Sequence, residues 1–256
     1  MDDGSTDDTE QLIAGLESDK ITYIKQSNQG VCAARNHGAE KARGKYLVFL
    51  DSDDFLSLNY LLNYYCNLNN SKFRLALGDI IWCDKNGLVL ECVNARMNEV
   101  FFTQPLSGSF AIDSKLFKIV GGYDLNLTYS ETSDLFISIY IRNLINLEEV
   151  IIVSNAGVHI EKVNRRARRT KYAEKHYLST KYFLKKHTEY FSMYPGSYIN
   201  YQKILSVSAL LNNNYKEAKN ITLFLVKNNP YNIKYYLQYL LVCIFPYFLK
   251  KYYSKL

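Results

Sequence analysis

The stretch that decides the fold is Gly44-Lys45-Tyr46-Leu47-Val48-Phe49-Leu50-Asp51-Ser52-Asp53-Asp54. Residues 45–50 are predominantly apolar, which predicts a strand buried on both faces. An acidic turn follows at the carboxyl end of that strand, and this is the edge where α/β sheets bind their ligands. We therefore expect a binding site at residues 51–54.

Helical and strand patterns alternate around this stretch. Helices are expected over 5–16, 30–42, 59–68 and 134–143, and strands over 21–24, 75–81, 87–91 and 150–153. Such alternation predicts an α/β fold with a mostly parallel sheet flanked by helices. The character changes near residue 165, so we expect a nucleotide-binding domain over 1–164 and a basic, aromatic helical region over 165–256. Within it, 214–237 has the pattern of a helical-repeat hairpin.

Composition excludes several classes of protein. A hydrophobic content of 48% with 22% charged residues is that of a globular chain with a sizeable core. The five cysteines are scattered and form no Cys-x-x-Cys spacing, which argues against a disulfide framework or a zinc ribbon and favours the cytoplasm. The acidic N-terminus does not look like a signal peptide. No recognised nucleic-acid motif accompanies the basic C-terminal region.

Four clusters carry candidate chemistry, each with a structural alternative. Asp3 either binds a ligand or caps a helix. Arg35, on a glycine-opened helix, suits a phosphate or a base edge, or that helix simply packs through its alanines. Carboxylates crowded in residues 51–54 repel one another unless a divalent cation neutralises them, the alternative being a solvated turn. Glu131 or Asp134 is either a general base or a helix cap.

Three of these segments occur in a specific order and spacing. They are Asp2-Asp3-Gly4-Ser5-Thr6-Asp7, Asn28-x-Gly30-x-x-x-Ala34-Arg35-Asn36-x-Gly38 and Gly44-x-Tyr46-x-x-Phe49-Leu50-Asp51-x-Asp53-Asp54. Together they resemble glycosyltransferase family 2, the inverting nucleotide-sugar enzymes with a GT-A fold. The resemblance covers roughly residues 1–165, and it implies that the first strand of the fold is missing from this sequence.

The resemblance implies a role for each matching residue. Asp3 reads the base of the donor, usually uracil, within a loop that includes Gly4 and Ser5. Arg35 contacts the diphosphate or the base. The Asp-x-Asp signature is Asp51-Ser52-Asp53, in which Asp53 holds Mn²⁺ or Mg²⁺. Asp54 shares the metal or holds the ribose, and His159 lies near the metal and the phosphates.

One departure concerns the catalytic base. The usual Glu-Asp pair of the family is Glu131-Thr132 in this chain, and a threonine hydroxyl is no base near neutral pH. Glu131 or Asp134 would have to substitute for it. This departure and the missing strand support a second hypothesis, a non-catalytic or truncated relative that binds nucleotide and metal. A phosphohydrolase or nucleotidyltransferase is a third, although it leaves the Arg35 segment unexplained.

The family also implies partners. We expect a UDP-sugar donor, a glycan or lipid-linked acceptor in cell-surface polysaccharide assembly, and a cytoplasmic location at the inner face of the membrane. Two C-terminal features bear on that location. Arg165, Arg166, Arg168 and Arg169 form a basic cluster that either grips phosphates or a membrane, or is a solvated linker. Residues 235–249 are apolar and aromatic and are followed by lysines, which predicts either a peripheral membrane helix or a buried terminal helix.

Overall fold

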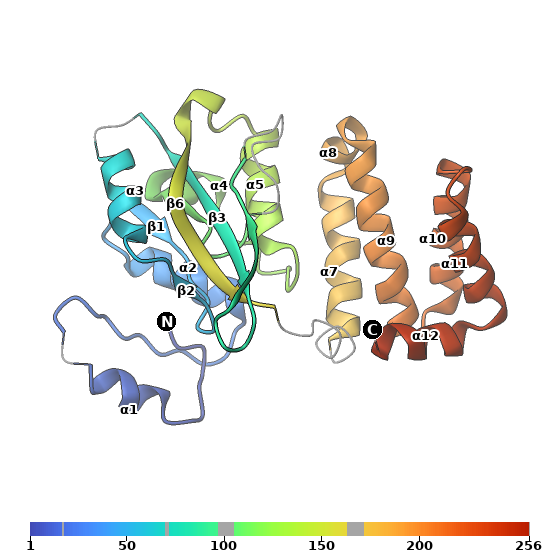
Figure 1. Cartoon of the computed structure of the whole chain (residues 1–256), viewed down its shortest axis with the longest axis horizontal. Coiled ribbons are helices and arrows are strands. Elements are labelled where there is room, and N and C mark those ends of the chain that lie inside the picture. The colour runs from blue at the N-terminus through green and yellow to red at the C-terminus, as the bar shows by residue number, and fades with distance from the viewer. Residues whose placement is uncertain (17, 70–71, 97–104, 163–171, 256) are drawn as a thin grey trace. The chain divides into compact units, whose positions relative to one another are not determined.

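The computed structural model describes residues 1–16, 18–69, 72–96, 105–162 and 172–255 (Figure 1). The chain divides into two compact units, Met1–Lys162 and Val163–Leu256. The first unit combines strands and helices, whereas the described part of the second unit is helical.

A six-stranded sheet forms the centre of the first unit. Its order is β1-β5-β3-β6-β2, and β4 pairs with β3. The strands are β1 (Tyr46–Val48), β2 (Phe55–Leu56), β3 (Leu75–Cys83), β4 (Val89–Val93), β5 (Phe110–Asp113) and β6 (Val150–Glu161). The helices of this unit are α1 (Thr9–Ala14), α2 (Val31–Lys41), α3 (Tyr60–Leu68), α4 (Ser114–Val120) and α5 (Glu131–Ile141), with a 3-10 turn at Leu147–Glu149.

The α/β class is confirmed, but the expectation of a mostly parallel sheet is wrong for the described strands. Of their five pairings, β3 with β6 is parallel and the other four are antiparallel. One cause is the tight turn that joins β3 to β4, in which the amide of Asp84 donates to the carbonyl of Leu88 at 2.9 Å. A hairpin connection of this kind requires antiparallel strands. The sequence-based expectation also omitted β2 and β5. Both of these strands run antiparallel to their neighbours, so they add antiparallel pairings to the sheet.

Helices cover both faces of the sheet because side chains alternate along the strands. Leu75 and Leu77 of β3 join a core cluster with residues of α2, α4 and α5. Ala76, between them, faces the opposite side, where it packs with Tyr60 and Tyr64 of α3. The small alanine leaves room for the two rings, which are 1% and 3% exposed. The sheet from which the acidic turn emerges is therefore held from both sides.

The second unit consists of helices packed on one another. They are α7 (Ala173–Lys186), α8 (Thr188–Met193), α9 (Pro195–Leu211), α10 (Tyr215–Asn228), α11 (Ile233–Ile244) and α12 (Pro246–Lys255). Contacts join α7 to α9, α9 to α10 and α10 to α11, so these four lie in a row (Figure 1). The hairpin expected over 214–237 corresponds to α10 and the first part of α11. None of the helices in the described part of the chain combines the length and apolar character needed to cross a bilayer.

At Gly78 the backbone of β3 closely approaches that of β6. The register of the two strands shifts between Leu77 and Asp79. A Cβ added at Gly78 would lie 2.1 Å from the carbonyl oxygen of Ala156 and 2.6 Å from the hydroxyl of Tyr64. Both neighbours belong to the packed interior, so neither can yield without moving backbone or a buried ring.

We predict that Gly78→Ala lowers the free energy of unfolding of the first unit by about 3 kcal/mol, the upper range for overpacking a core. Urea unfolding followed through Trp82, the single tryptophan of the chain, measures this. Gly15→Ala is the matched control, because its nearest contact would be an ordinary 3.5 Å and its φ is −74°. Equal unfolding midpoints for the two variants would contradict the close approach.

Candidate active site

Asp3 holds the N-terminal loop against the start of α2. One of its carboxylate oxygens accepts hydrogen bonds from the side chain of Gln26 and the amide of Gln29, and the other accepts from the amide of Gly30, all at 2.8 Å. Burial opposes ionisation, but the hydrogen bonds from Gln29, Gln26 and Gly30 outweigh it and hold the pKa of Asp3 below its ordinary value. The alternative role, a cap of α1, is not observed, since the residue that precedes α1 is Asp8.

Gly4 and Ser5 complete this loop. Gly4 has a φ of 85°, and a Cβ there would lie 2.9 Å from the backbone nitrogen of Asn28, so the position requires glycine. The amide of Ser5 donates to the carboxylate of Asp2 at 2.7 Å. The two loops 2–5 and 26–30 are thus held together by backbone and side-chain contacts.

Asp2 is a residue whose importance the sequence did not reveal. Its side chain accepts from the hydroxyl of Tyr23, and its backbone bridges the segment around Lys25. The Tyr23 hydroxyl, with the Ser5 amide, lowers the pKa of Asp2 to about 2. Nothing in the local pattern of residues 21–24 pairs Tyr23 with Asp2, because the contact spans 21 residues of sequence.

Arg35 is the central cation of the candidate site. Its guanidinium donates to Asp51 at 2.6 Å and to Glu131 at 3.0 Å, and it lies over the ring of Tyr123, 5.3 Å from the centroid. The Arg35 side chain is 10% exposed, compared with 43% for Asp51 and 20% for Glu131. Burial opposes its charge, but Tyr123, Asp51 and Glu131 together raise the pKa of Arg35 above its ordinary value.

Asn36, the residue after Arg35, fixes the loop that carries Tyr123. Its side-chain amide donates to the carbonyl of Tyr123 and accepts from the amide of the same residue, each at 2.8 Å. Tyr123 is 2% exposed and packs edge-on against Phe49, with ring centroids 5.2 Å apart. In the sequence, Tyr123 is notable only as the residue after a glycine-glycine turn. In the structure, its ring packs against the guanidinium of Arg35.

The acidic turn after β1 brings three carboxylates together. One oxygen from each of Asp51, Asp53 and Asp54 lies within 4.8 Å of the others. Asp51 and Asp54 are half-buried, whereas Ser52 and Asp53 are exposed. Asp51 pairs with Arg35, and Asp53 and Asp54 carry carboxylate oxygens of the kind that a hard cation binds.

His159 lies beside this turn but is not part of the carboxylate group. It is the partner of Phe55 across β2 and β6, and the two rings stack at 4.4 Å. Its Nε2 lies 3.1 Å from the hydroxyl of Ser57, and its buried Nδ1 has no hydrogen-bond partner among the described residues. Burial lowers the pKa of His159, which favours the neutral ring that binds metals or donates a single proton.

The two candidate bases differ in their surroundings. Glu131 is the first residue of α5, is half-buried and faces Arg35. Asp134, one turn further, is 2% exposed, and its side chain has interactions within the protein. Thr132 is also buried, at 7%. The geometry therefore presents Glu131, and neither of the others, at the surface of the site.

Comparison with known proteins shows what this chain is similar to. Residues 1–102 match the model of the family described as Glycosyl transferase family 2. The motif-bearing part of the first unit is therefore similar to glycosyltransferase family 2. The match favours a glycosyltransferase over the phosphohydrolase or nucleotidyltransferase hypothesis.

The relatives of this chain are similar to it over part of their length. An uncharacterized glycosyltransferase of Rickettsia bellii is 30% identical over 152 residues, which cover 57% of this chain and 22% of that protein. One of Haemophilus influenzae is 33% identical over 115 residues, covering 44% of this chain and 46% of that protein. The chain thus spans less than half the length of these curated relatives. The crystal structure of S. aureus TarS 1–349 with UDP-GlcNAc is similar in fold, with a TM-score of 0.53 and 15% identity over 90% of this chain and 82% of that one.

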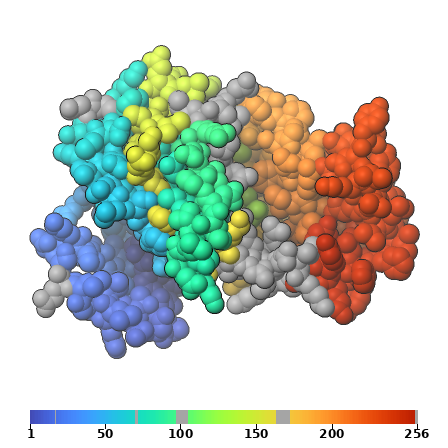
Figure 2. Space-filling view, viewed as in Figure 1, coloured from blue at the N-terminus to red at the C-terminus, as the bar shows by residue number. Residues whose placement is uncertain are grey.

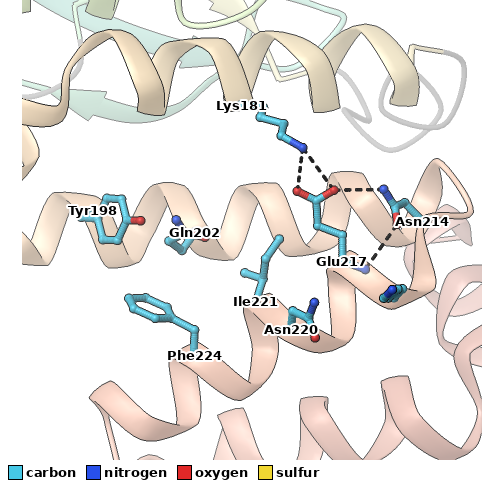
Figure 3. A pocket seen from close by; sticks show the side chains of 9 residues that line it. Lys181, Tyr198, Gln202, Asn214, Glu217, Asn220, Ile221 and Phe224 are labelled. Atoms are coloured by element: carbon cyan, nitrogen blue, oxygen red, sulfur yellow. Dashed lines mark hydrogen bonds and ion pairs between the residues drawn. The ribbon is translucent and has the colours of Figure 1, made fainter.

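A separate depression lies in the second unit, outside the residues that match the family model (Figure 3). Its volume is about 480 Å³, and Lys181, Tyr198, Gln202, Glu217 and Phe224 contribute to its wall. The ammonium of Lys181 lies 3.1 Å from the carboxylate of Glu217, so these two charges neutralise each other. It contains none of the motif residues that the sequence singles out, and the candidate active site remains the acidic turn of the first unit. The basic cluster at residues 165–169 lies outside the described residues.

We predict a pH-dependent effect for Tyr23→Phe, which removes a hydrogen-bond donor from Asp2. The pKa of Asp2 is about 2 in the folded protein and about 4 in an unfolded chain. A depressed pKa stabilises the folded state above the unfolded pKa, and this contribution disappears as the pH falls through 4 toward 2. Tyr23→Phe is therefore expected to lower stability at pH 6 and to approach the original protein near pH 2.

Denaturant unfolding at a series of pH values measures this difference. Tyr231→Phe serves as the control, since Tyr231 is fully exposed, and it should leave stability unchanged at every pH. A Tyr23→Phe deficit of constant size from pH 6 to pH 2 would show that the Asp2 carboxylate is not the partner that matters.

Proposed function

We propose that this protein transfers a sugar from a UDP-linked donor to a hydroxyl group of an acceptor, with inversion at the anomeric carbon. The observation that carries the proposal is the ion pairing of Arg35 with both Asp51 and Glu131. It joins the Asp-x-Asp turn to the segment that carries the base in this family. These residues are 16 and 96 positions from Arg35 in the sequence.

The donor would lie across the loops that Asp3 and Arg35 organise. The family 2 motif, and the UDP-GlcNAc complex of the similarly folded TarS, support a uridine diphosphate donor. Asp3 already accepts three hydrogen bonds from the protein, but an ionised carboxylate has about four acceptor positions. One position remains for the imide N–H of uracil, with Gly4 and Ser5 beside it.

The residues of the acidic turn fit a divalent cation. Asp53 and Asp54 supply hard oxygen ligands, which select Mn²⁺ or Mg²⁺, and the unpartnered Nδ1 of His159 lies on the strand paired with the residue after Asp54. When bound, such a cation takes up negative charge on the diphosphate. Ser52 is exposed in the same turn and is available to the donor phosphates.

Glu131 is the residue that we assign to the acceptor. Its carboxylate takes the proton of the acceptor hydroxyl, whose oxygen then attacks the anomeric carbon from the face opposite the leaving group. The bond from that carbon to the phosphate oxygen breaks, and UDP leaves with the electron pair. Arg35 would hold the phosphate as charge develops on it. Asp134 is a weaker assignment because it is buried.

The acceptor that we propose is a glycan or a lipid-linked intermediate of cell-surface polysaccharide assembly. This assignment rests on the similarity of residues 1–102 to glycosyltransferase family 2, and it would place the protein at the cytoplasmic face of the membrane. Contact with the membrane through the C-terminal helices is part of the same proposal.

The second candidate function is that of a non-catalytic protein that binds nucleotide and metal. One specific observation favours it: Thr132 occupies the usual position of the base and is buried at 7% exposure. Such a protein would keep the donor site and lack the transfer step. Binding and turnover therefore have to be measured separately.

We predict that UDP binds this chain in a Mn²⁺-dependent manner and that Asp53→Ala weakens this binding at least about tenfold, or about 1.4 kcal/mol. Isothermal titration calorimetry with UDP, with and without Mn²⁺, makes the measurement. Asp8→Ala is the matched control, because Asp8 is exposed and its side chain caps no helix. UDP binding that is indifferent to Mn²⁺ and to Asp53 would overturn the assignment of the metal.

We predict that Glu131→Gln reduces turnover about 100-fold or more, the range of a lost general base, while UDP affinity changes less than about threefold. Glutamine keeps a hydrogen-bond acceptor for Arg35 but cannot take a proton at neutral pH. The measurement is UDP release with a UDP-sugar and an acceptor. Glu148→Gln, whose side chain is 82% exposed, is the control.

If UDP binds but Glu131→Gln leaves turnover unchanged, Glu131 is not the base. If UDP binds and no donor–acceptor pair gives turnover, the non-catalytic function is supported. Under that outcome Thr132→Asp, which restores the usual family residue, is the next variant to assay.

A further inference from the structure

The last two helices expose apolar side chains in a regular pattern. On α11, Ile233, Leu237, Leu240 and Ile244 are 71%, 53%, 50% and 61% exposed. Their spacing of three to four residues places them on one face of the helix. The opposite face carries Tyr235 and Val242, which are 7% and 4% exposed and pack into the unit. Both faces of α11 therefore carry large apolar side chains, and those of the outward face are exposed to solvent.

The pattern continues on α12. Phe245, at the junction of the two helices, is 57% exposed, and Tyr247 and Phe248 are 74% and 67% exposed. Leu249 is 4% exposed and anchors α12 to the unit, while contacts link α12 to both α9 and α11. This C-terminal segment, red in Figure 2, forms a broad part of the visible surface. The alternative of a buried terminal helix is wrong for this face.

We name the exposed residues of these helices the apolar face. Its members are Ile233, Tyr236, Leu237, Leu240, Leu241, Ile244, Phe245, Tyr247, Phe248 and Tyr252. Exposed apolar areas of this extent mark interaction sites, since isolated soluble surfaces rarely gather so many large apolar side chains.

The charge of the same segment is one-sided. From residue 218 to residue 256 the sequence has no aspartate or glutamate, whereas Lys219, Lys227, Lys234, Lys250, Lys251 and Lys255 are all cationic. Lys234 and Lys251 are exposed on the two helices of the apolar face. A partner that contacts this segment would meet apolar and positive groups and no negative side chain.

We infer that the apolar face is a docking surface for a bilayer that contains anionic lipids. The 12 residues of α11 are too few to cross a hydrocarbon core, which takes about 20, but a helix lying in the interface needs no such length. Tyrosine and phenylalanine side chains suit the headgroup level, and lysines suit anionic headgroups. The inference specifies the membrane contact of the proposed function, and it stands on the second unit alone.

The test is co-sedimentation of the full chain with vesicles, one set of phosphatidylcholine and one set that also contains phosphatidylglycerol. We expect binding to the anionic vesicles to exceed binding to the neutral ones at least about tenfold and to weaken with added salt. Leu240→Glu and Phe248→Glu should each reduce binding about tenfold or more, since each places a negative charge in the apolar face. Because both side chains are exposed, neither variant is expected to unfold the helices, which circular dichroism checks.

Leu125→Glu is the matched control, because Leu125 is 66% exposed in the first unit, and it should bind vesicles as the original chain does. A fluorophore on Cys243 of α11, after Cys66→Ser and Cys92→Ser remove the other exposed thiols, should shift to the blue on binding.

Three outcomes would overturn the inference: no binding to anionic vesicles, binding that Leu240→Glu and Phe248→Glu leave intact, or self-association in solution that these variants abolish while vesicle binding is absent. The last outcome would assign the face to a second copy of the chain. None of these results depends on UDP binding or sugar transfer, so failure of the membrane inference is distinguishable from failure of the proposed enzyme activity.

Discussion

The interaction on which the candidate site depends is the buried guanidinium of Arg35 between Asp51 and Glu131. A charged side chain that is only 10% exposed is costly unless it is paired, and here two carboxylates and an aromatic ring compensate it. Removing any one partner would leave the others imperfectly neutralised. The pairing therefore ties three segments, α2, the turn after β1 and the start of α5, into one electrostatic unit.

The surrounding packing keeps this electrostatic unit in place. Asn36 holds the backbone of Tyr123 with two hydrogen bonds, and Phe49, one residue beyond β1, packs against the Tyr123 ring. Phe49 also contacts Phe117 of α4, with ring centroids 5.2 Å apart. Because Phe49 directly follows β1, the end of this strand fixes where the Tyr123 ring lies, and that ring in turn contacts Arg35. A glycosyltransferase of this arrangement would not have to assemble its polar groups when the donor arrives, because the apolar core has already oriented them.

The sequence predicted those parts of the fold that depend on local pattern. Helix α2 (Val31–Lys41) and strand β3 (Leu75–Cys83) fall close to the expected ranges, because their periodicity is clear over several residues. The expected helix over 5–16 is shorter in the structure, as α1 (Thr9–Ala14), and β6 (Val150–Glu161) is much longer than the strand expected over 150–153. Strands β2 and β5 have two and four residues, too few to show a period, and they are defined by pairing with distant strands.

The candidate site shows the same division between local and distant information. The acidic turn could be predicted directly from residues 51–54, since strand and carboxylates are adjacent in sequence. The contacts of Asp3 with Gln29 and Gly30, and of Asp2 with Tyr23, join segments more than 20 residues apart. The family motifs indicated that these segments belong to one site, but they did not predict which atoms contact one another. Sequence also could not separate Glu131 from Asp134, because that distinction is one of burial.

The two units carry complementary parts of the proposed function. The polar chemistry lies in the first unit, whereas the apolar face and its lysines lie in the second. A protein held on a bilayer by its second unit would meet lipid-linked acceptors at a higher effective concentration than one free in solution. This gain requires no additional contact between acceptor and active site. Under this proposal the site would need less affinity for the acceptor itself, because attachment to the membrane would raise the local concentration of the acceptor.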